Sequence, residues 1–220
     1  MNVLLCGTRT FGAHALRALT PKVVAVVAPP GDRTATEAEK LGLPVHRDVT
    51  ESLVRDLRVD LIVGAHTHAY IGRRSRAAAT YGALGYHPSL LPRHRGKDAV
   101  RWTIKMGDPI AGGSVYWYTD NVDCGPVAAQ AWCHVLPGWD HHDLWREALF
   151  PIGVELLERV VGDVAAGRIV QVDQDERAAS WEPTWERPPV HRPELIELGD
   201  GQERIRVIKE TTWAGDPVRC

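Results

Sequence analysis

The sequence predicts an α/β fold built around a central, mostly parallel, twisted sheet. Three short apolar runs, at residues 3–6, 23–27 and 61–63, each end close to a glycine or a proline. Short, continuous runs that are partly β-branched fit strands buried on both faces, as in a parallel sheet. Helical patterns separate the runs, and this alternation of strands and helices indicates βαβ units.

The helices of the first half follow from apolar spacing. Residues 11–19 place four apolar side chains on one helical face, and residues 35–41 and 52–57 are also compatible with helices. Each of these segments lies between two of the predicted strands or directly after one. The first half of the chain therefore predicts repeated crossovers of the βαβ type.

A glycine-containing loop at residues 7–12 joins the first predicted strand to the first helix. It does not match the dinucleotide fingerprint Gly-x-Gly-x-x-Gly, because Arg9 stands where the glycine that approaches the pyrophosphate belongs. A nicotinamide cofactor is therefore not expected. Two alternatives stay open: a tight turn that only positions the helix, or an anion site for an acceptor substrate at the helix N-terminus.

The second half of the chain continues the alternation with less regular segments. Residues 87–92 are predicted to be irregular, because two prolines bracket them and proline resists both helices and central strands. The other predicted elements are a helix at 75–81, a strand at 82–86, a helix at 98–106, strands at 114–118 and 127–135, and an amphipathic helix at 143–164.

The composition changes after about residue 171, which predicts a boundary between two parts. Residues 1–170 are expected to form the catalytic domain, and residues 171–220 a C-terminal arm. Residues 180–193 of the arm hold two tryptophans and four prolines. Such an arm is suited to shaping an acceptor pocket or to forming a homodimer contact.

Composition and charge exclude several classes of protein. The net charge is -2, which gives no support for a nucleic-acid-binding protein. No apolar run approaches the ~20 residues that a membrane-spanning helix needs. The N-terminus lacks the basic start and the cleavage site of a signal peptide. We expect a cytoplasmic protein that binds neither membranes nor nucleic acids.

The stretch between Tyr86 and Pro126 carries the most informative motifs. It begins Tyr-His-Pro-Ser-Leu-Leu-Pro-Arg-His-Arg-Gly and closes with Asp-Cys-Gly-Pro. With these motifs, and with Asp123 lying 36 residues after His87, the chain resembles the folate-dependent formyltransferase family. Within that family it is most similar to the hydrolase domain of 10-formyltetrahydrofolate dehydrogenase. The resemblance covers roughly residues 2–170 and implies a Rossmann-like formyltransferase fold.

The resemblance implies 10-formyltetrahydrofolate as the cosubstrate, with His87 and Asp123 as the catalytic residues. Formyl transfer passes through a tetrahedral intermediate, whose oxyanion needs preorganised donors. A histidine at a strand end, stiffened by the following proline, is such a donor. A carboxylate accepts the proton of the attacking nucleophile and orients the histidine. We therefore expect His87 to contact the oxyanion and the leaving group, and Asp123 to act as the base.

The resemblance also implies where folate binds. The loop at residues 66–71 is expected to surround the pterin, largely through backbone groups, and the loop at residues 119–123 to cover its other side. The predicted folate-binding residues are His66, Thr67, His68, Ala69, Tyr70, Ile71, Ser89, Leu90, Thr119, Asp120 and Val122.

Two further sets of residues are candidates for an anion site and for a metal site. Arg93, Arg95 and Lys97 form a basic cluster beside the motif, which is either a solvated face or a site for an anionic group of the acceptor or of folate. The histidine pairs at 66 and 68 and at 141 and 142 lack a third ligand of the kind that zinc requires, so no metal is expected.

One departure from the family pattern leaves the acceptor open. Most amine formyltransferases of the family carry an asparagine two residues before the histidine, where this chain has Gly85. The first hypothesis is transfer of the formyl group to an amine of a small metabolite. The second is hydrolysis, in which water accepts the formyl group. The third, of another class, is a non-catalytic module that binds folate or a partner.

Overall fold

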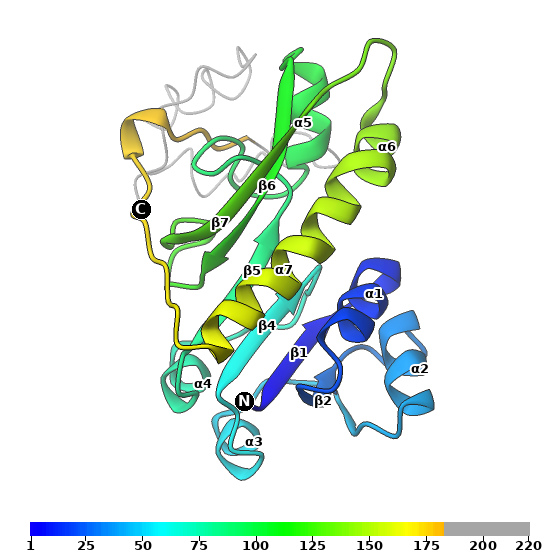
Figure 1. Ribbon diagram of the computed structural model, residues 1–220, viewed down its shortest axis with the longest axis vertical. Coiled ribbons are helices and arrows are strands. Elements are labelled where there is room, and N and C mark those ends of the chain that lie inside the picture. Colours follow the sequence, from blue (N-terminus) through cyan, green and yellow to red (C-terminus); the bar gives the residue numbers. More distant parts are fainter. Residues whose placement is uncertain (183–220) are drawn as a thin grey trace, which may run out of the picture.

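The computed structural model describes residues 1–182 and contains one seven-stranded sheet (Figure 1). The strand order is β3-β2-β1-β4-β5-β6-β7, and the strands from β3 to β5 are parallel whereas β6 and β7 are antiparallel. The strands are β1 (Val3–Gly7), β2 (Val23–Val27), β3 (Val45–His46), β4 (Leu61–Ala65), β5 (Ala83–His87), β6 (Ile110–Trp117) and β7 (Val127–His134). The predicted α/β fold with a mostly parallel sheet is confirmed.

Helices cover both faces of this sheet. They are α1 (Arg9–Leu19), α2 (Arg33–Lys40), α3 (Glu51–Asp56), α4 (Arg73–Ala78), α5 (Ala99–Lys105), α6 (His141–Leu144) and α7 (Phe150–Ala165). The main core lies between the sheet and α1 and α7, where Phe11, Leu16 and Leu157 are buried together. A second core on the opposite face joins Ile62 to Val54 of α3. Apolar burial on both faces explains why the inner strands are continuous apolar runs.

The helix predicted at residues 143–164 is interrupted, and this prediction is corrected. A π-helical turn, η1 (Trp145–Leu149), separates α6 from α7. Pro151 lies in the first turn of α7 and has no N–H to donate to a carbonyl one turn earlier. A widened turn before the proline accommodates this loss, and such turns occur mostly as single insertions within helices.

Two other predicted boundaries differ from the structure. The helix predicted at 75–81 is α4, which begins at Arg73 and ends at Ala78. The strand predicted at 114–118 is β6, which begins at Ile110. Gly113 hid the start of this strand, since glycine is rare in strands. A Cβ added there would lie 2.6 Å from the Cζ of Tyr86, so a glycine is needed where that ring crosses the sheet.

The segment that follows α7 runs back beside β7 rather than away from the sheet (Figure 1). We call residues 172–182 the strap. Val172 bridges to Val127, and Trp181 bridges to Arg95. The strap thus packs on the part of the chain predicted to be catalytic, while the boundary proposed at residue 170 stays a prediction. Most of the arm predicted at 171–220, and any dimer contact made by residues 183–220, lies outside the described residues.

Candidate active site

His87 is the last residue of β5 and lies at the carboxyl edge of the parallel strands, where ligands bind in open α/β sheets. Its side chain is buried, with 7% of the residue exposed. The ring Nε2 lies 2.7 Å from the carbonyl oxygen of His94. Because a carbonyl can only accept, this nitrogen carries the hydrogen. The contact fixes the plane of the ring and leaves Nδ1 to face Asp123.

Asp123 approaches His87 because the loop between β6 and β7 folds back over β5. Its Oδ2 lies 3.6 Å from Nδ1 of His87, and the residue is also 7% exposed. The hydroxyl of Tyr116 donates to Oδ1 at 2.6 Å, and the backbone N–H of Gly96 donates to Oδ2 at 2.7 Å. Two donors therefore hold the carboxylate toward the histidine. The structure brings the predicted catalytic pair together.

A buried polar network holds the carbonyl group that orients His87. The His94 ring places Nδ1 2.7 Å from a carboxylate oxygen of Glu182 and Nε2 2.9 Å from one of Asp108. The backbone N–H of His94 donates to the hydroxyl of Ser180 at 2.8 Å. Two of these partners, Ser180 and Glu182, belong to the strap. The strap thus helps to fix the geometry of His87 through the main chain of residue 94.

The strap also holds the loop that carries Asp123. The side-chain amide of Gln174 donates to the carbonyl oxygens of Asp123 and Gly125, at 2.8 and 2.7 Å. The guanidinium of Arg95 donates to Gln174 at 2.7 Å and to Glu176 at 2.6 Å. The loop that contains Arg95 and the loop that contains Asp123 are consequently tied to one segment, whose sequence carries no recognisable motif.

These contacts change the interpretation of the predicted basic cluster. Arg95 is only 1% exposed and pairs with Glu176, so it does not offer its guanidinium to an acceptor in this structure. Arg93 makes two contacts of 2.7 Å with the carboxylate of Asp108. Lys97 is exposed. Anion binding by Arg93 and Lys97 stays a prediction, whereas for Arg95 burial and ion pairing favour a structural role.

The two loops predicted to contact folate lie close enough to share one side chain. Arg76 of α4 donates to the carbonyl oxygen of Ile71 at 2.7 Å and forms an ion pair with Asp120. The first loop ends at the buried Ile71, while Tyr70 is 85% exposed. Sequence reasoning missed Arg76, because the arginine pairs with a residue 44 positions away.

The remaining predicted folate residues fall into an exposed and a buried set. His66, His68, Thr119 and Val122 are exposed, and Thr67 and Ala69 are partly buried. Ser89 is buried and donates to the carbonyl oxygen of Arg93 at 2.5 Å, while Leu90 packs against Gly112. The exposed set offers backbone and side-chain groups to a ligand, and the buried set shapes the loop after His87. Contact of these residues with folate stays a prediction.

The glycine-containing loop at residues 7–12 binds an anionic group of the protein itself. The backbone N–H of Arg9, at the start of α1, lies 2.9 Å from both carboxylate oxygens of Asp32. Partial burial acts to raise the pKa of Asp32, but hydrogen bonds from Thr34 and Arg9 outweigh it and keep the pKa below its ordinary value. The carboxylate of Asp32 occupies this donor, which favours the tight-turn alternative over an acceptor site.

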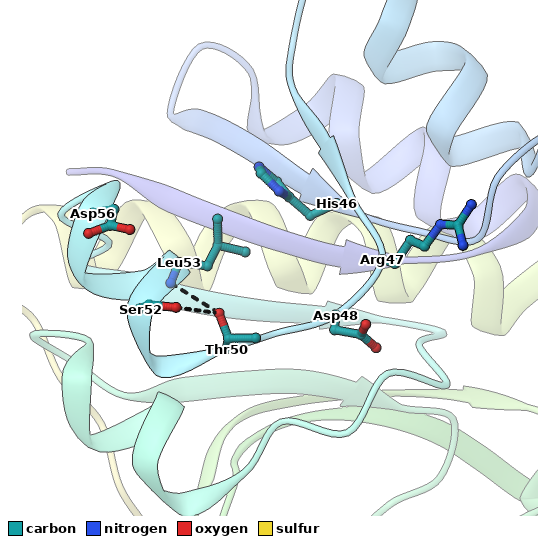
Figure 2. Close-up of a pocket in the computed structure, with 7 residues that line it drawn as sticks. All are labelled: His46, Arg47, Asp48, Thr50, Ser52, Leu53 and Asp56. Atoms are coloured by element: carbon teal, nitrogen blue, oxygen red, sulfur yellow. Dashed lines mark hydrogen bonds between the residues drawn. The ribbon is translucent and has the colours of Figure 1, made fainter.

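A surface hollow lies beside β3, at the edge of the parallel part of the sheet, and Figure 2 shows the residues that line it. It lies beside His46 of β3 and the start of α3, and three strands stand between β3 and β5. Polar side chains line most of it, including Arg47, Asp48 and Thr50.

Among residues 1–182, no group of three or more His, Cys, Asp or Glu side chains could hold a metal ion. No helix in the same range is long and apolar enough to cross a bilayer.

Comparison with known proteins points to one family. The family described as "Formyl transferase" matches residues 15–160. The mitochondrial 10-formyltetrahydrofolate dehydrogenase of Homo sapiens is 33% identical over 202 residues, which cover 83% of this chain and 22% of that protein. The chain thus corresponds to about a fifth of the length of this relative.

Solved structures share the fold. Glycinamide ribonucleotide transformylase 1 from Symbiobacterium toebii superposes with a TM-score of 0.69 at 22% identity, covering 80% of this chain and 95% of that one. An N-formyltransferase from Helicobacter canadensis, solved with folinic acid and dTDP-3-aminofucose, gives a TM-score of 0.69 at 14% identity, covering 83% and 70%. The expected Rossmann-like formyltransferase fold is confirmed.

Proposed function

The chain belongs to the formyl transferase family, and we propose that it transfers the formyl group of 10-formyltetrahydrofolate to an amine of a small metabolite. The observation that carries this proposal is the approach of His87 to Asp123, whose Nδ1 and Oδ2 lie 3.6 Å apart. Both side chains are buried and held by other hydrogen bonds. Preorganisation of this kind suits a reaction in which charge develops on one oxygen atom.

The reaction begins when the nucleophile attacks the formyl carbon and the carbonyl electron pair moves to the oxygen. Asp123 accepts the proton of the nucleophile, directly or through one water molecule. In this proposal the ring of His87 carries a hydrogen on both nitrogens, so Nδ1 donates to the oxyanion while Nε2 stays bound to the carbonyl oxygen of His94. The electron pair then returns to re-form the carbonyl, the carbon–nitrogen bond to folate breaks, and the folate nitrogen takes up the proton that Asp123 had accepted. Asp123 also stabilises the protonated ring of His87 by its charge.

Folate binding draws support from the arrangement around Arg76. This side chain joins the loop that ends at Ile71 to the loop that contains Asp120. A joint of this kind keeps the two loops at a fixed separation, as a flat ligand between them requires. The proposal takes 10-formyltetrahydrofolate as a cosubstrate that binds between these loops, and a small molecule rather than a nucleic acid as the acceptor. It also takes the cytoplasm as the location.

Hydrolysis is the second candidate, because residue 85 is a glycine. Most amine formyltransferases of the family carry an asparagine at this position, so its absence leaves open whether the acceptor is an amine or water. Identity of 33% to a 10-formyltetrahydrofolate dehydrogenase also favours this candidate. A non-catalytic module is disfavoured, since a module of that kind has no use for a buried, hydrogen-bonded His87 and Asp123.

One experiment separates these functions. The full chain is mixed with 10-formyltetrahydrofolate, with and without a panel of small amines, and release of tetrahydrofolate is followed by absorbance. We expect release that depends on an amine and disappears in Asp123→Asn. The matched control is Asp56→Asn, an exposed aspartate of α3 far from His87. Release without any amine, abolished by the same variant, would support hydrolysis. Folate binding without turnover would support the module, and no folate binding at all would refute the proposal.

A further inference from the structure

Gly64 and Gly85 are paired neighbours on the adjacent strands β4 and β5. We call the gap that these two glycines leave on the sheet surface the glycine notch. The notch is filled. A Cβ added to Gly85 would lie 2.6 Å from Cζ of Tyr118, and one added to Gly64 would lie 3.0 Å from the same atom. The hydroxyl of Tyr118 lies closer still to both positions. The tip of the phenol therefore occupies the space that a side chain at residue 85 would take.

The glycine notch adjoins the catalytic pair. Gly85 and His87 are two residues apart on β5, so a side chain at residue 85 would point to the same face as His87. Tyr116 pairs with Gly85 across β5 and β6, and its ring centroid lies 5.2 Å from that of Tyr118. The hydroxyl of Tyr116 donates to Asp123. The Tyr118 hydroxyl thus lies on the reactive face, next to the group that holds the base.

We propose that Tyr118 is a catalytic residue whose hydroxyl, seated in the glycine notch, donates a hydrogen bond to the formyl oxygen as the tetrahedral intermediate forms. This inference deepens the proposed function and rests on it. The hydroxyl takes the place of a polar side chain at residue 85, and the notch determines its position. Tyr118 and His87 then form a pair of donors on one oxygen.

The chemistry of this step requires no proton from Tyr118. As the nucleophile bonds to the formyl carbon, the carbonyl electron pair moves to the oxygen, and the phenol O–H strengthens its hydrogen bond to that charge. When the bond to the folate nitrogen breaks, the pair returns to the carbonyl. Burial, and then the negative charge of Asp123, raise the pKa of Tyr118 above its ordinary value. The phenol therefore stays neutral and remains a donor across the physiological range.

A purely structural role for Tyr118 makes a different prediction. The ring packs against the second core, so it could fill space without taking part in the reaction. Tyr118→Phe keeps the ring and removes only the hydroxyl oxygen. A structural role predicts unchanged turnover in this variant, whereas a donor role predicts a loss of turnover with the folate affinity preserved.

The first test therefore measures kcat and KM for 10-formyltetrahydrofolate in Tyr118→Phe. We expect kcat to fall about 10²-fold, as on removal of one oxyanion donor, with KM within a factor of about three. The control is Tyr81→Phe, at the opposite end of β5, which should match the wild-type chain. Unchanged kcat in Tyr118→Phe, or a change confined to KM, would overturn the inference while the active wild type upholds the proposed function. An inactive wild type would overturn both.

The second test moves the donor from residue 118 to residue 85. Tyr118→Ala empties the glycine notch and should lose at least as much kcat as Tyr118→Phe. Adding Gly85→Asn to that variant places an amide in the vacated space, and we expect kcat to recover about tenfold. Gly85→Asn alone should be impaired, because its Cβ would overlap the Tyr118 ring. A double variant no more active than Tyr118→Ala would contradict the claim that the notch positions the donor.

Discussion

The parallel half of the sheet and the loops around His94 and Asp123 are held together by different forces. Leu5, Val26 and Ile62 lie on inner strands, are completely buried and touch apolar neighbours. His94 and Asp123 are also buried, but hydrogen bonds and ion pairs connect their loops to the strap. Apolar contacts are non-directional, whereas hydrogen bonds weaken steeply with angle. The first kind of contact supplies stability, and the second kind sets the positions of catalytic atoms.

The largest expected effect lies at His87, which the loops around His94 and Asp123 contact, and it concerns activity alone. His87→Ala removes a donor at the reacting oxygen, so turnover should fall about 10³-fold or more. Binding of a folate analogue, followed by calorimetry, should stay within a few-fold of the wild-type value. Turnover close to that of the wild type would show that His87 has no catalytic role.

The opposite result is expected in the parallel half. Leu157 of α7 is completely buried in the main core. Leu157→Ala should lower the free energy of unfolding by about 3 kcal/mol, measured by urea denaturation, because it leaves a cavity. The kcat of the folded fraction should be unchanged. A fall in kcat comparable to that of a catalytic variant would show that the two regions are not separable.

A variant of the strap should affect activity more than stability. Gln174→Ala removes both donors to the carbonyl oxygens of Asp123 and Gly125. We expect kcat to fall about tenfold, because small displacements of a catalytic group slow the reaction strongly. The loss in unfolding free energy should be only about 1–2 kcal/mol. Gln171→Ala, at an exposed neighbouring position, serves as the matched control. Equal activity in the two variants would show that the Gln174 contact does not affect the active site.

The smallest expected effect is a pH dependence of stability from Asp108. Partial burial raises the pKa of this carboxyl, but hydrogen bonds from Arg93 and His94 outweigh it, and the pKa lies below its ordinary value. A lowered folded-state pKa contributes stability above the unfolded-state pKa of about 3.9, and this contribution is lost as the pH falls through the folded-state value. Asp108→Asn should therefore cost about 1 kcal/mol at pH 7. At pH 3 the unfolding free energies of the wild type and of Asp108→Asn should differ little. A difference that grew toward low pH would contradict a lowered pKa of Asp108 in the folded state.

The sequence predicted the fold, and it singled out His87 and Asp123, which the structure brings together, because both leave local patterns. Apolar runs mark β1, β2 and β4, and His87 is followed by proline in a distinctive motif. The partners of the pair leave no such signal. The carbonyl of His94 and the N–H of Gly96 are backbone groups that nearly all residues carry, so the identity of a side chain does not reveal them.

Long-range pairing hid the other contributors. Gln174 reaches residues about 50 positions earlier in the chain, and Arg76 pairs across 44. In the sequence, Tyr118 looks like any aromatic residue of a strand. Only the structure shows that its hydroxyl lies in the glycine notch. The burial and ion pairing of Arg95 were hidden for the same reason, since its partner Glu176 lies 81 positions away.

The strap has a consequence for the order of synthesis on the ribosome. Domains acquire structure as the chain emerges, beginning with N-terminal residues. All seven strands and α7 precede residue 166, so the sheet is able to assemble before Gln174 or Glu182 has left the exit tunnel. A nascent chain stalled at that stage would hold a packed sheet whose His94 and Asp123 loops lack their partners. Under the proposed function, formyl transfer would then begin only after the strap has emerged, well after the core has closed.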